Sequence, residues 1–329
     1  MNTASGFAVA RVPLSSPAVF QRCPRLTYAI VPPNRATPVE RRRVIAAAQS
    51  QRISALPLDA LLVYDVQDEA VRNGAPRPFP FTPKVDPLSY AFEQLQIGAL
   101  PRVIYRAVAD QGEAALRDWL DRVRARSGHA VLVGAPSRSI SPSLSLAQAF
   151  SLSRAQVPGL SLGGVLISER HETSGTEDAR VWAKMQQGCR FFVSQTVWSV
   201  AATKRLLQAL RMRGEREGCQ VPPILLTFSP CGSEQTLQFL EWLGVSLPLH
   251  VKRELRSTKD MLARSVELAA EAFAELSAFA AEQGMDVGCN VESVSARVEE
   301  VEASVELVRR IDQLALPNPT SRPARKLKP

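Results

Sequence analysis

The chain has 329 residues, of which 45% are hydrophobic, so it is long enough to form one large domain with a sizeable core. No apolar run reaches the length of a membrane-spanning helix, and we expect no membrane partner. The net charge of +8 comes from the ends, because residues 1–52 carry +7 and residues 317–329 carry +4, which leaves −3 for the remainder. This distribution argues against a nucleic-acid partner on the folded surface.

Five cysteines are scattered along the chain without a CxxC pair, and Cys189 and Cys289 lie in or beside apolar runs. This pattern favours reduced, mostly buried thiols, and we expect a cytoplasmic protein. Residues 1–25 contain Ser, Ala, Pro and three Arg but no acid, a composition shared by transit peptides and ordinary extensions. We expect a flexible extension, with import into an organelle as the alternative.

Eight short apolar segments are predicted to be strands, and each is followed by a segment of helical composition. The predicted strands are residues 26–31, 58–64, 102–108, 130–133, 162–167, 189–193, 224–228 and 286–290. A proline-rich loop at residues 74–87 follows the second strand and is long enough to be a lid or a binding loop. A long helix over residues 254–283 is expected before the last strand.

This alternation predicts an α/β protein that forms a single (β/α)8 TIM barrel over residues 26–316, with an extra helix before the last strand. Residues 317–329 are polar and basic, and we expect them to be a disordered tail. A doubly wound open sheet is the alternative, but no GxGxxG motif follows the first strand.

Polar residues stand where several predicted strands end. In a parallel barrel these ends meet on one rim, where the active-site residues of such barrels lie. The rim is expected to carry Asp65, Glu69, Glu169, His171, Gln195 and Asn290, among others. A mixture of carboxylates, amides and one histidine suits a polar heterocycle better than a hydrolytic metal, and no metal site is predicted.

The central stretch resembles the methylenetetrahydrofolate reductase family. Residues 168–172 (SERHE) match the family's "PE-x-HPE", and Lys184 precedes Gln195 by eleven residues, as in the family. Residues 188–195 (GCRFFVSQ) resemble "G-A-x-F-x-x-T-Q". Weaker matches follow in family order at residues 28–33, 134–136, 221–224 and 242–248, so the resemblance runs from about residue 26 to 314.

This resemblance implies a barrel that reduces 5,10-methylenetetrahydrofolate to 5-methyltetrahydrofolate with NADH or NADPH, through FAD, in one-carbon metabolism and methionine biosynthesis. It implies that Gln195 binds the pterin, and we expect Asn290 as a second substrate contact. His171, Glu177 and Lys184 match family positions that contact the flavin. The expected partner is a reduced folate, and a homo-oligomer is compatible with the sequence.

Two departures from the family concern acids. Ala29 stands where the family has its strand-one glutamate, and Ala135 where it has an aspartate near flavin and folate. Since alanine cannot transfer a proton, another carboxylate must serve, and Asp65, Glu69 and Glu169 are the expected catalytic candidates. The departures leave room for direct hydride transfer from a nicotinamide without FAD. The alternative from another class is a folate- or pterin-binding barrel without redox activity.

Overall fold

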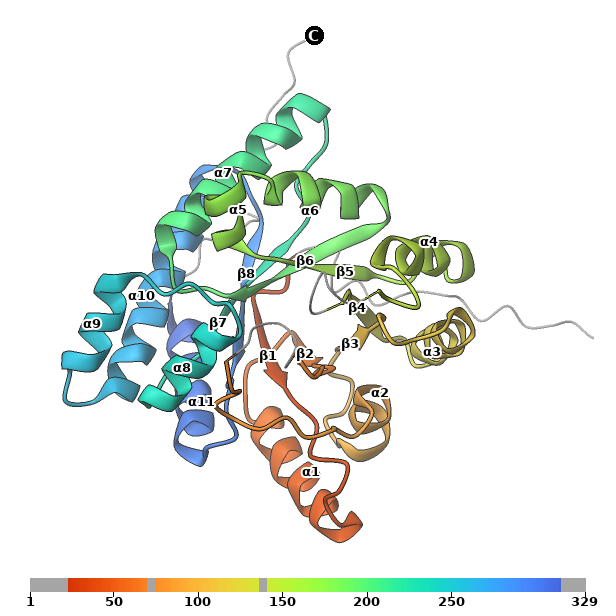
Figure 1. The fold of residues 1–329 in the computed structure, drawn as a ribbon, viewed down its shortest axis with the longest axis horizontal. Coiled ribbons are helices and arrows are strands. Elements are labelled where there is room, and N and C mark those ends of the chain that lie inside the picture. The colour runs from red at the N-terminus through yellow and green to blue at the C-terminus, as the bar shows by residue number, and fades with distance from the viewer. Residues whose placement is uncertain (1–22, 70–74, 136–140, 315–329) are drawn as a thin grey trace, which may run out of the picture.

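The structure is a computed structural model that describes residues 23–69, 75–135 and 141–314. Eight parallel strands pair in chain order, and the last strand pairs with the first to close a barrel (Figure 1). The (β/α)8 barrel is therefore confirmed, and the open sheet is wrong. The expected extension at 1–25 and the expected tail at 317–329 lie outside the described residues, except for residues 23–25.

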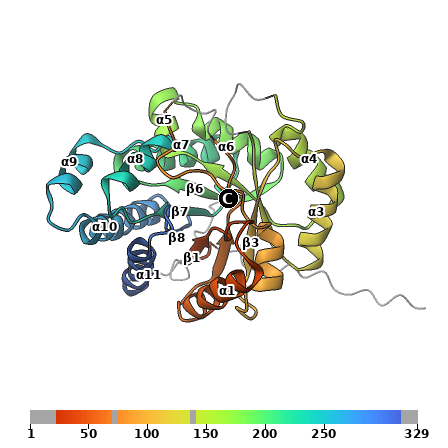
Figure 2. The same cartoon turned by 60° about the horizontal axis from the view of Figure 1, so that its bottom comes forward.

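The strands are β1 (Leu26–Ile30), β2 (Ala60–Val63), β3 (Arg102–Ala107), β4 (His129–Val133), β5 (Leu162–Leu166), β6 (Cys189–Thr196), β7 (Ile224–Phe228) and β8 (Val287–Glu292). The helices, which pack around the outside of the barrel (Figures 1 and 2), are α1 (Val39–Ser54), α2 (Pro87–Ser89), η3 (Tyr90–Gln94), α3 (Glu113–Ala125), α4 (Leu146–Gln156), α5 (Ser168–Ser174), α6 (Glu177–Gln186), α7 (Val200–Glu217), α8 (Glu234–Trp242), α9 (Leu249–Ser257), α10 (Met261–Glu282) and α11 (Val298–Gln313). All eight strands overlap the predicted segments.

Two helical segments differ from the sequence expectation. The single helix expected at 254–283 is divided into α9 and α10, because the side chain of Asp260 accepts a hydrogen bond from the backbone N–H of Ala263 and begins a new helix. The segment 168–174 is a helix, α5, that begins directly after β5. This second difference determines where Glu169 and His171 point.

The part of the barrel interior nearer the amino ends of the strands is filled by apolar side chains. Leu62, Val103, Val131 and Phe191 are buried there in one cluster. A methyl group at Gly163 would lie 2.4 Å from the ring of Phe191, so only glycine leaves space for that ring. The interior of the barrel is therefore packed toward the amino ends of its strands, and the cavity lies toward their carboxyl ends.

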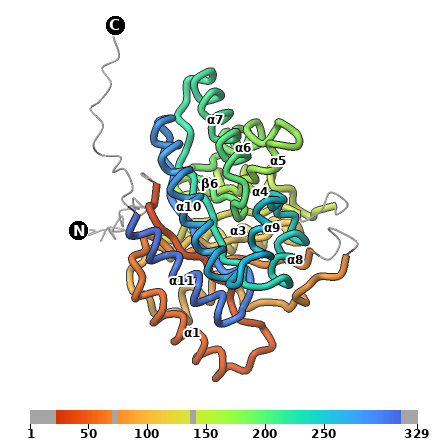
Figure 3. Tube along the Cα trace, turned by 90° about the vertical axis from the view of Figure 1, so that its left-hand side faces the viewer, coloured from red at the N-terminus to blue at the C-terminus, as the bar shows by residue number. Residues whose placement is uncertain are grey.

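The described residues contain no helix that is both long and apolar enough to cross a membrane. All five cysteines are free thiols, of which Cys189, Cys231 and Cys289 are buried. Helices α1 and α11 lie side by side and cover β1 (Figures 1 and 3), and an ion pair between Arg52 and Glu302 joins them.

The proline-rich residues 75–86, here called the roof segment, run across the carboxyl ends of the strands. At one end, Trp242 Nε1 donates to the carbonyl oxygen of Ala75 over 2.9 Å, and Gln235 Nε2 donates to that of Pro78 over 3.0 Å. Toward the other end, the backbone N–H of Arg35 donates to the carbonyl oxygen of Pro83 over 2.8 Å. The roof segment thus connects α8 to the loop between β1 and α1.

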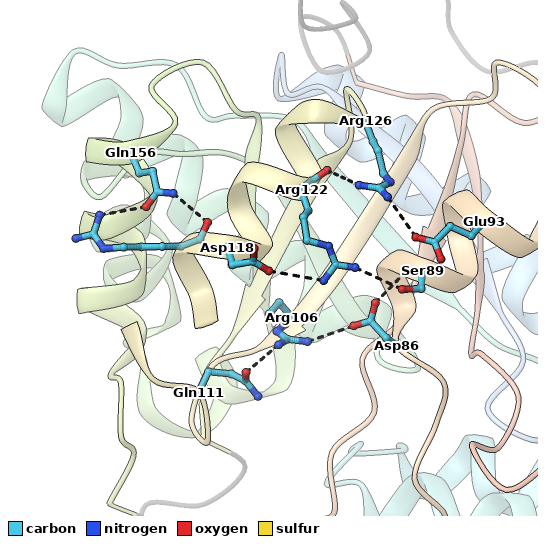
Figure 4. Close-up of polar contacts among 10 residues, drawn as sticks. Asp86, Ser89, Glu93, Arg106, Gln111, Asp118, Arg122, Arg126 and Gln156 are labelled. Atoms are coloured by element: carbon cyan, nitrogen blue, oxygen red, sulfur yellow. Dashed lines mark hydrogen bonds and ion pairs between the residues drawn. The ribbon is translucent and has the colours of Figure 1, made fainter. Parts of the chain in front are cut away.

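The roof segment ends at Asp86, which is held by two contacts (Figure 4). Its Oδ1 accepts from the backbone N–H of Ser89 over 2.9 Å and begins α2. Its Oδ2 lies 3.5 Å from Arg106 Nη1, and the other guanidinium nitrogen of Arg106 donates to Gln111 over 2.8 Å. Arg106 on β3 therefore fixes the end of the roof segment to the barrel.

Candidate functional site

A cavity of about 1110 Å³ lies between the carboxyl ends of the strands and the roof segment. Small-molecule sites usually occupy roughly 300–1,000 Å³, so this cavity has room for more than one small ligand. It continues outward along the face of α1 that carries Arg41 and Arg52. Ala29 and Ala135, the positions where the resemblance to methylenetetrahydrofolate reductases implied acids, both line it.

Four of the eight sequence-predicted site residues line this cavity, namely Asp65, Glu69, Lys184 and Gln195. The other four, Glu169, His171, Glu177 and Asn290, are not among its lining residues. The structure therefore brings together the residues that follow β2, one residue of α6 and the amide of β6.

Gln195 offers a free hydrogen-bond acceptor to the cavity. Its Nε2 donates to the carbonyl oxygen of Leu243 over 3.2 Å, which fixes the amide. Its Oε1 is buried and has no hydrogen-bond partner among the residues that the structure describes. A buried acceptor without a partner costs about 1–3 kcal/mol, so a ligand that donates a hydrogen bond here would recover that free energy.

Asp65 and Lys184 are both tied to the barrel backbone. Asp65 Oδ2 accepts from the backbone N–H of Ala107 over 2.9 Å, and burial raises the pKa of this carboxyl group above its ordinary value. Lys184 Nζ donates to the carbonyl oxygen of Val165, and burial lowers the pKa of its ammonium group. Both side chains are held in place at the cavity wall.

Glu169 does not face the pocket of Gln195, contrary to expectation. It lies in the first turn of α5, is 6% exposed, and interacts with the backbone of Trp198 and Ser199 at the start of α7. Its Oε1 has no hydrogen-bond partner, and burial raises its pKa to about 7. Because α5 starts directly after β5, its first turn directs this carboxyl group toward α7 instead of the cavity.

The expected flavin contacts His171 and Glu177 also point elsewhere. The Nδ1 atom of His171 lies 3.6 Å from Oδ1 of Asp178. Glu177 is fully buried, and its carboxylate accepts from the backbone N–H of Ile167 over 3.0 Å and from Arg170 over 3.3 Å. Glu177 therefore holds the residue that follows β5 in place. This arrangement does not fit a flavin held by His171, Glu177 and Lys184 together.

Asn290 lies within the barrel, below the cavity wall. Its Nδ2 donates to the hydroxyl of Tyr64 over 3.0 Å and to that of Thr227 over 3.2 Å, and its Oδ1 accepts from Thr27 over 3.0 Å. Both hydrogens of its amide nitrogen are used in these contacts, so Asn290 orients Tyr64 instead of donating a hydrogen bond to the cavity.

Glu292 is a cavity acid that the sequence places near the rim but that was not among the expected catalytic candidates. It ends β8, is paired in register with Ala29 of β1, and forms a hydrogen bond with Tyr64. Desolvation raises its pKa to about 7, whereas the hydrogen bond from Tyr64 acts to lower it. Strand periodicity could have indicated it, because a residue two positions after Asn290 lies on the same face. The carboxyl group of Glu292 therefore stands beside Ala29 in the barrel.

Two cations of the roof segment, Arg77 and Lys84, also line the cavity and were not singled out from the sequence. The rings of Phe79, Phe81 and Phe239 accompany them. The proline-rich composition indicated a binding loop, but which side chains face inward depends on how the segment is attached to α8 and to the β1–α1 loop. Among the described residues, no group of three or more His, Cys, Asp or Glu side chains could hold a metal ion.

No protein-family model matches the chain, and no curated protein matches it either. Among solved structures, 2,3-dimethylmalate lyase is 14% identical, with a TM-score of 0.43 over 96% of this chain and 89% of the lyase chain. This similarity is too remote to bear on function. An uncharacterized protein from Clostridium thermocellum that binds two copies of 5-methyl-5,6,7,8-tetrahydrofolic acid is 33% identical, with a TM-score of 0.76 over 88% of this chain and 96% of that protein. With this identity and coverage, the chain belongs to the same family as the Clostridium thermocellum protein.

Proposed function

We propose that the cavity binds a reduced folate, with the pterin ring inside the barrel mouth. The family relationship supports this, since the Clostridium thermocellum relative binds 5-methyltetrahydrofolate. The observation that carries the proposal is the unpartnered Oε1 of Gln195 on the cavity wall. The pterin ring presents several N–H donors on one edge, and such a donor would satisfy this oxygen.

Replacing Gln195 by alanine should weaken 5-methyltetrahydrofolate binding by about tenfold or more, because a buried hydrogen bond is lost. Isothermal titration calorimetry on the full chain measures this change. Gln208→Ala is the matched control, since Gln208 is exposed on α7 and does not line the cavity. Wild-type protein that binds no reduced folate would exclude the proposal.

A finer proposal is the reduction of 5,10-methylenetetrahydrofolate to 5-methyltetrahydrofolate. Opening the methylene bridge needs a proton on N10, and hydride addition to the resulting iminium carbon on N5 gives the methyl group. A reduced nicotinamide would donate the hydride and be released in its oxidised form. Glu292 would donate the proton, since its pKa of about 7 keeps a large protonated fraction near neutral pH.

The cavity geometry favours direct transfer without FAD. The space of about 1110 Å³ allows a second ligand beside the pterin, whereas two of the three expected flavin contacts face away from it. The test is nicotinamide oxidation that depends on methylenetetrahydrofolate, measured with NADH and with NADPH, each with and without FAD. Folate binding without turnover in all four assays would favour the non-redox folate-binding barrel.

A further inference from the structure

Two positive charges are placed side by side in the roof of the cavity. Arg77 lies among aromatic rings, with its guanidinium carbon 5.6 Å from the centre of Phe81, 5.2 Å from Phe239 and 5.0 Å from Trp242. Burial lowers the pKa of Arg77, and burial together with the charge of Arg77 lowers that of Lys84. Both side chains are only partly buried, and an anion bound between them would offset the unfavourable effect of two neighbouring like charges.

Both cations keep donors that the described residues leave unused. Arg77 Nε and Nη1 are buried without a hydrogen-bond partner. Lys84 Nζ donates to Asn34 Oδ1 and to Thr82 Oγ1, which leaves one of its three N–H groups available.

Two nearby acids, Asp68 and Glu69, also act on the charge of Arg77. The charges of Asp68 and Glu69 act to raise its pKa, against the larger effect of burial. Both acids already have interaction partners of their own. The guanidinium therefore retains the capacity to bind a further anion in the cavity.

The part of the cavity nearer the strand ends carries several hydrogen-bond acceptors, with Lys184 beside them. Glu292 and Asp65 form its deep wall with Gln195, and all three present hydrogen-bond acceptors. A reduced folate has a matching polarity, because its pterin end carries N–H donors and its glutamate end carries two carboxylates. A folate with its pterin deep in the barrel would direct its glutamate toward the roof segment.

We propose that Arg77 and Lys84 form a carboxylate clamp that holds the glutamate tail of the bound folate, an assignment that rests on the proposed folate binding. The Arg77 guanidinium can bind a carboxylate through two parallel hydrogen bonds, and Lys84 adds one more. Phe79 and Phe239, whose ring centres are 5.2 Å apart, lie in the same wall and provide faces for the aminobenzoyl ring.

The clamp is tested by removing the charge from either side of the contact. Calorimetry compares 5-methyltetrahydrofolate with 5-methyltetrahydropteroate, which has the same rings but no glutamate. Wild-type protein should bind the first ligand about 10- to 100-fold more tightly, as expected for charge-assisted hydrogen bonds. Arg77→Gln should lose most of this difference and bind the tail-less ligand within about twofold of wild type.

Arg253→Gln is the control, because Arg253 is an exposed arginine of α9 outside the cavity, and it should behave as wild type. Lys84→Gln, which leaves the aromatic packing of Arg77 intact, should also reduce the preference for the tail. The unchanged affinity for the tail-less ligand shows that each variant is folded.

Three results would overturn the clamp. Equal affinity of wild type for the two ligands, or equal weakening of both by Arg77→Gln, would exclude a contact with the tail. Selective loss of NADPH binding in Arg77→Gln, with the folate preference intact, would assign the cations to a phosphate instead. If wild type binds neither folate ligand, the proposed function fails and the clamp fails with it.

Discussion

The carboxyl group of Glu292 shares its side of the cavity with the hydroxyl of Tyr64, and this contact controls when the acid loses its proton. Desolvation raises the Glu292 pKa to about 7, and the Tyr64 hydrogen bond opposes that rise because it stabilises the ionised form. An acid that must donate a proton is active only while protonated. The proposed reductase should therefore lose activity as the pH rises through about 7.

Removing the hydroxyl in Tyr64→Phe should raise the Glu292 pKa further and move the loss of activity to higher pH. Glu292→Gln should lower turnover by about 10²- to 10⁴-fold while folate affinity changes little. Steady-state rates between pH 5 and 9, with calorimetry on each variant, measure both effects. A pH profile that is the same in wild type and Tyr64→Phe would exclude Glu292 as the titrating acid.

Glu169 has a comparable pKa but a different consequence, because it is buried outside the cavity. It ionises near 4.5 in the unfolded chain and near 7 in the folded protein, so the unfolded state loses its proton first as the pH rises. The native state therefore becomes less stable between about pH 5 and 7. At still higher pH both states are ionised, and this loss of stability persists.

Glu169→Gln should abolish this loss, and the variant should gain up to about 3 kcal/mol over wild type at pH 8 relative to pH 4. Urea unfolding at the two pH values measures the difference. Glu282→Gln, an exposed glutamate of α10, is the control and should show no pH-dependent gain. An equal effect of Glu169→Gln at both pH values would contradict the buried titration.

Some site residues could be predicted from the sequence because strand ends converge in a barrel. This reasoning placed Asp65, Glu69 and Gln195 correctly on the cavity. It failed for Glu169, because the first turn of α5 rotates the side chain away from the rim. It placed Glu292 near the rim but did not choose it as a catalytic acid, because β8 continues two residues beyond the predicted end.

At the level of elements, the roof segment depends on a few anchors at its ends. Arg106 holds Asp86 at 3.5 Å and Gln111 at 2.8 Å, and Asp86 in turn begins α2 (Figure 4). Because both side chains of the ion pair are largely shielded from water, the contact is screened less than a surface pair. The position of Lys84, two residues before Asp86, is coupled to this anchor.

Arg106→Ala should loosen the end of the roof segment and weaken folate binding by about three- to tenfold. Hydrogen exchange should become faster at residues 82–90 and stay unchanged in α7. Arg124→Ala is the control, because Arg124 forms an exposed ion pair with Asp121 on α3 and is not part of this anchor. Unchanged exchange in the Arg106 variant would show that other contacts hold the segment.

The positions of the strands and of most helices could be predicted from the apolar runs and from the Gly, Pro and polar residues that end them. The path of the roof segment could not, because it is determined by hydrogen bonds from Trp242, Gln235 and Arg35, which lie far from it in sequence. The division between α9 and α10 had a local signal in the capping residue Asp260, although the continuous helical composition concealed it.

For the whole molecule, the order of short motifs predicted both the barrel and a connection with folate. The closed barrel is confirmed, and the Clostridium thermocellum relative binds 5-methyltetrahydrofolate. Reduction by a nicotinamide is proposed on other grounds. A pattern of short motifs can identify a shared fold, but proteins with the same fold often catalyse different reactions. Ala29 and Ala135 illustrate the limit, because both line the cavity but neither can supply the acid that the resemblance implied at its position.

The packed lower barrel, in which Phe191 occupies the space left by Gly163, closes one end of the cavity. A molecule seated against Glu292 and Gln195 can then escape only past whatever lies nearer the opening. A second ligand that lies between this molecule and the opening must bind after it and leave before it. In that arrangement, ordered binding kinetics would follow from the closed end of the barrel, whichever reaction takes place inside it.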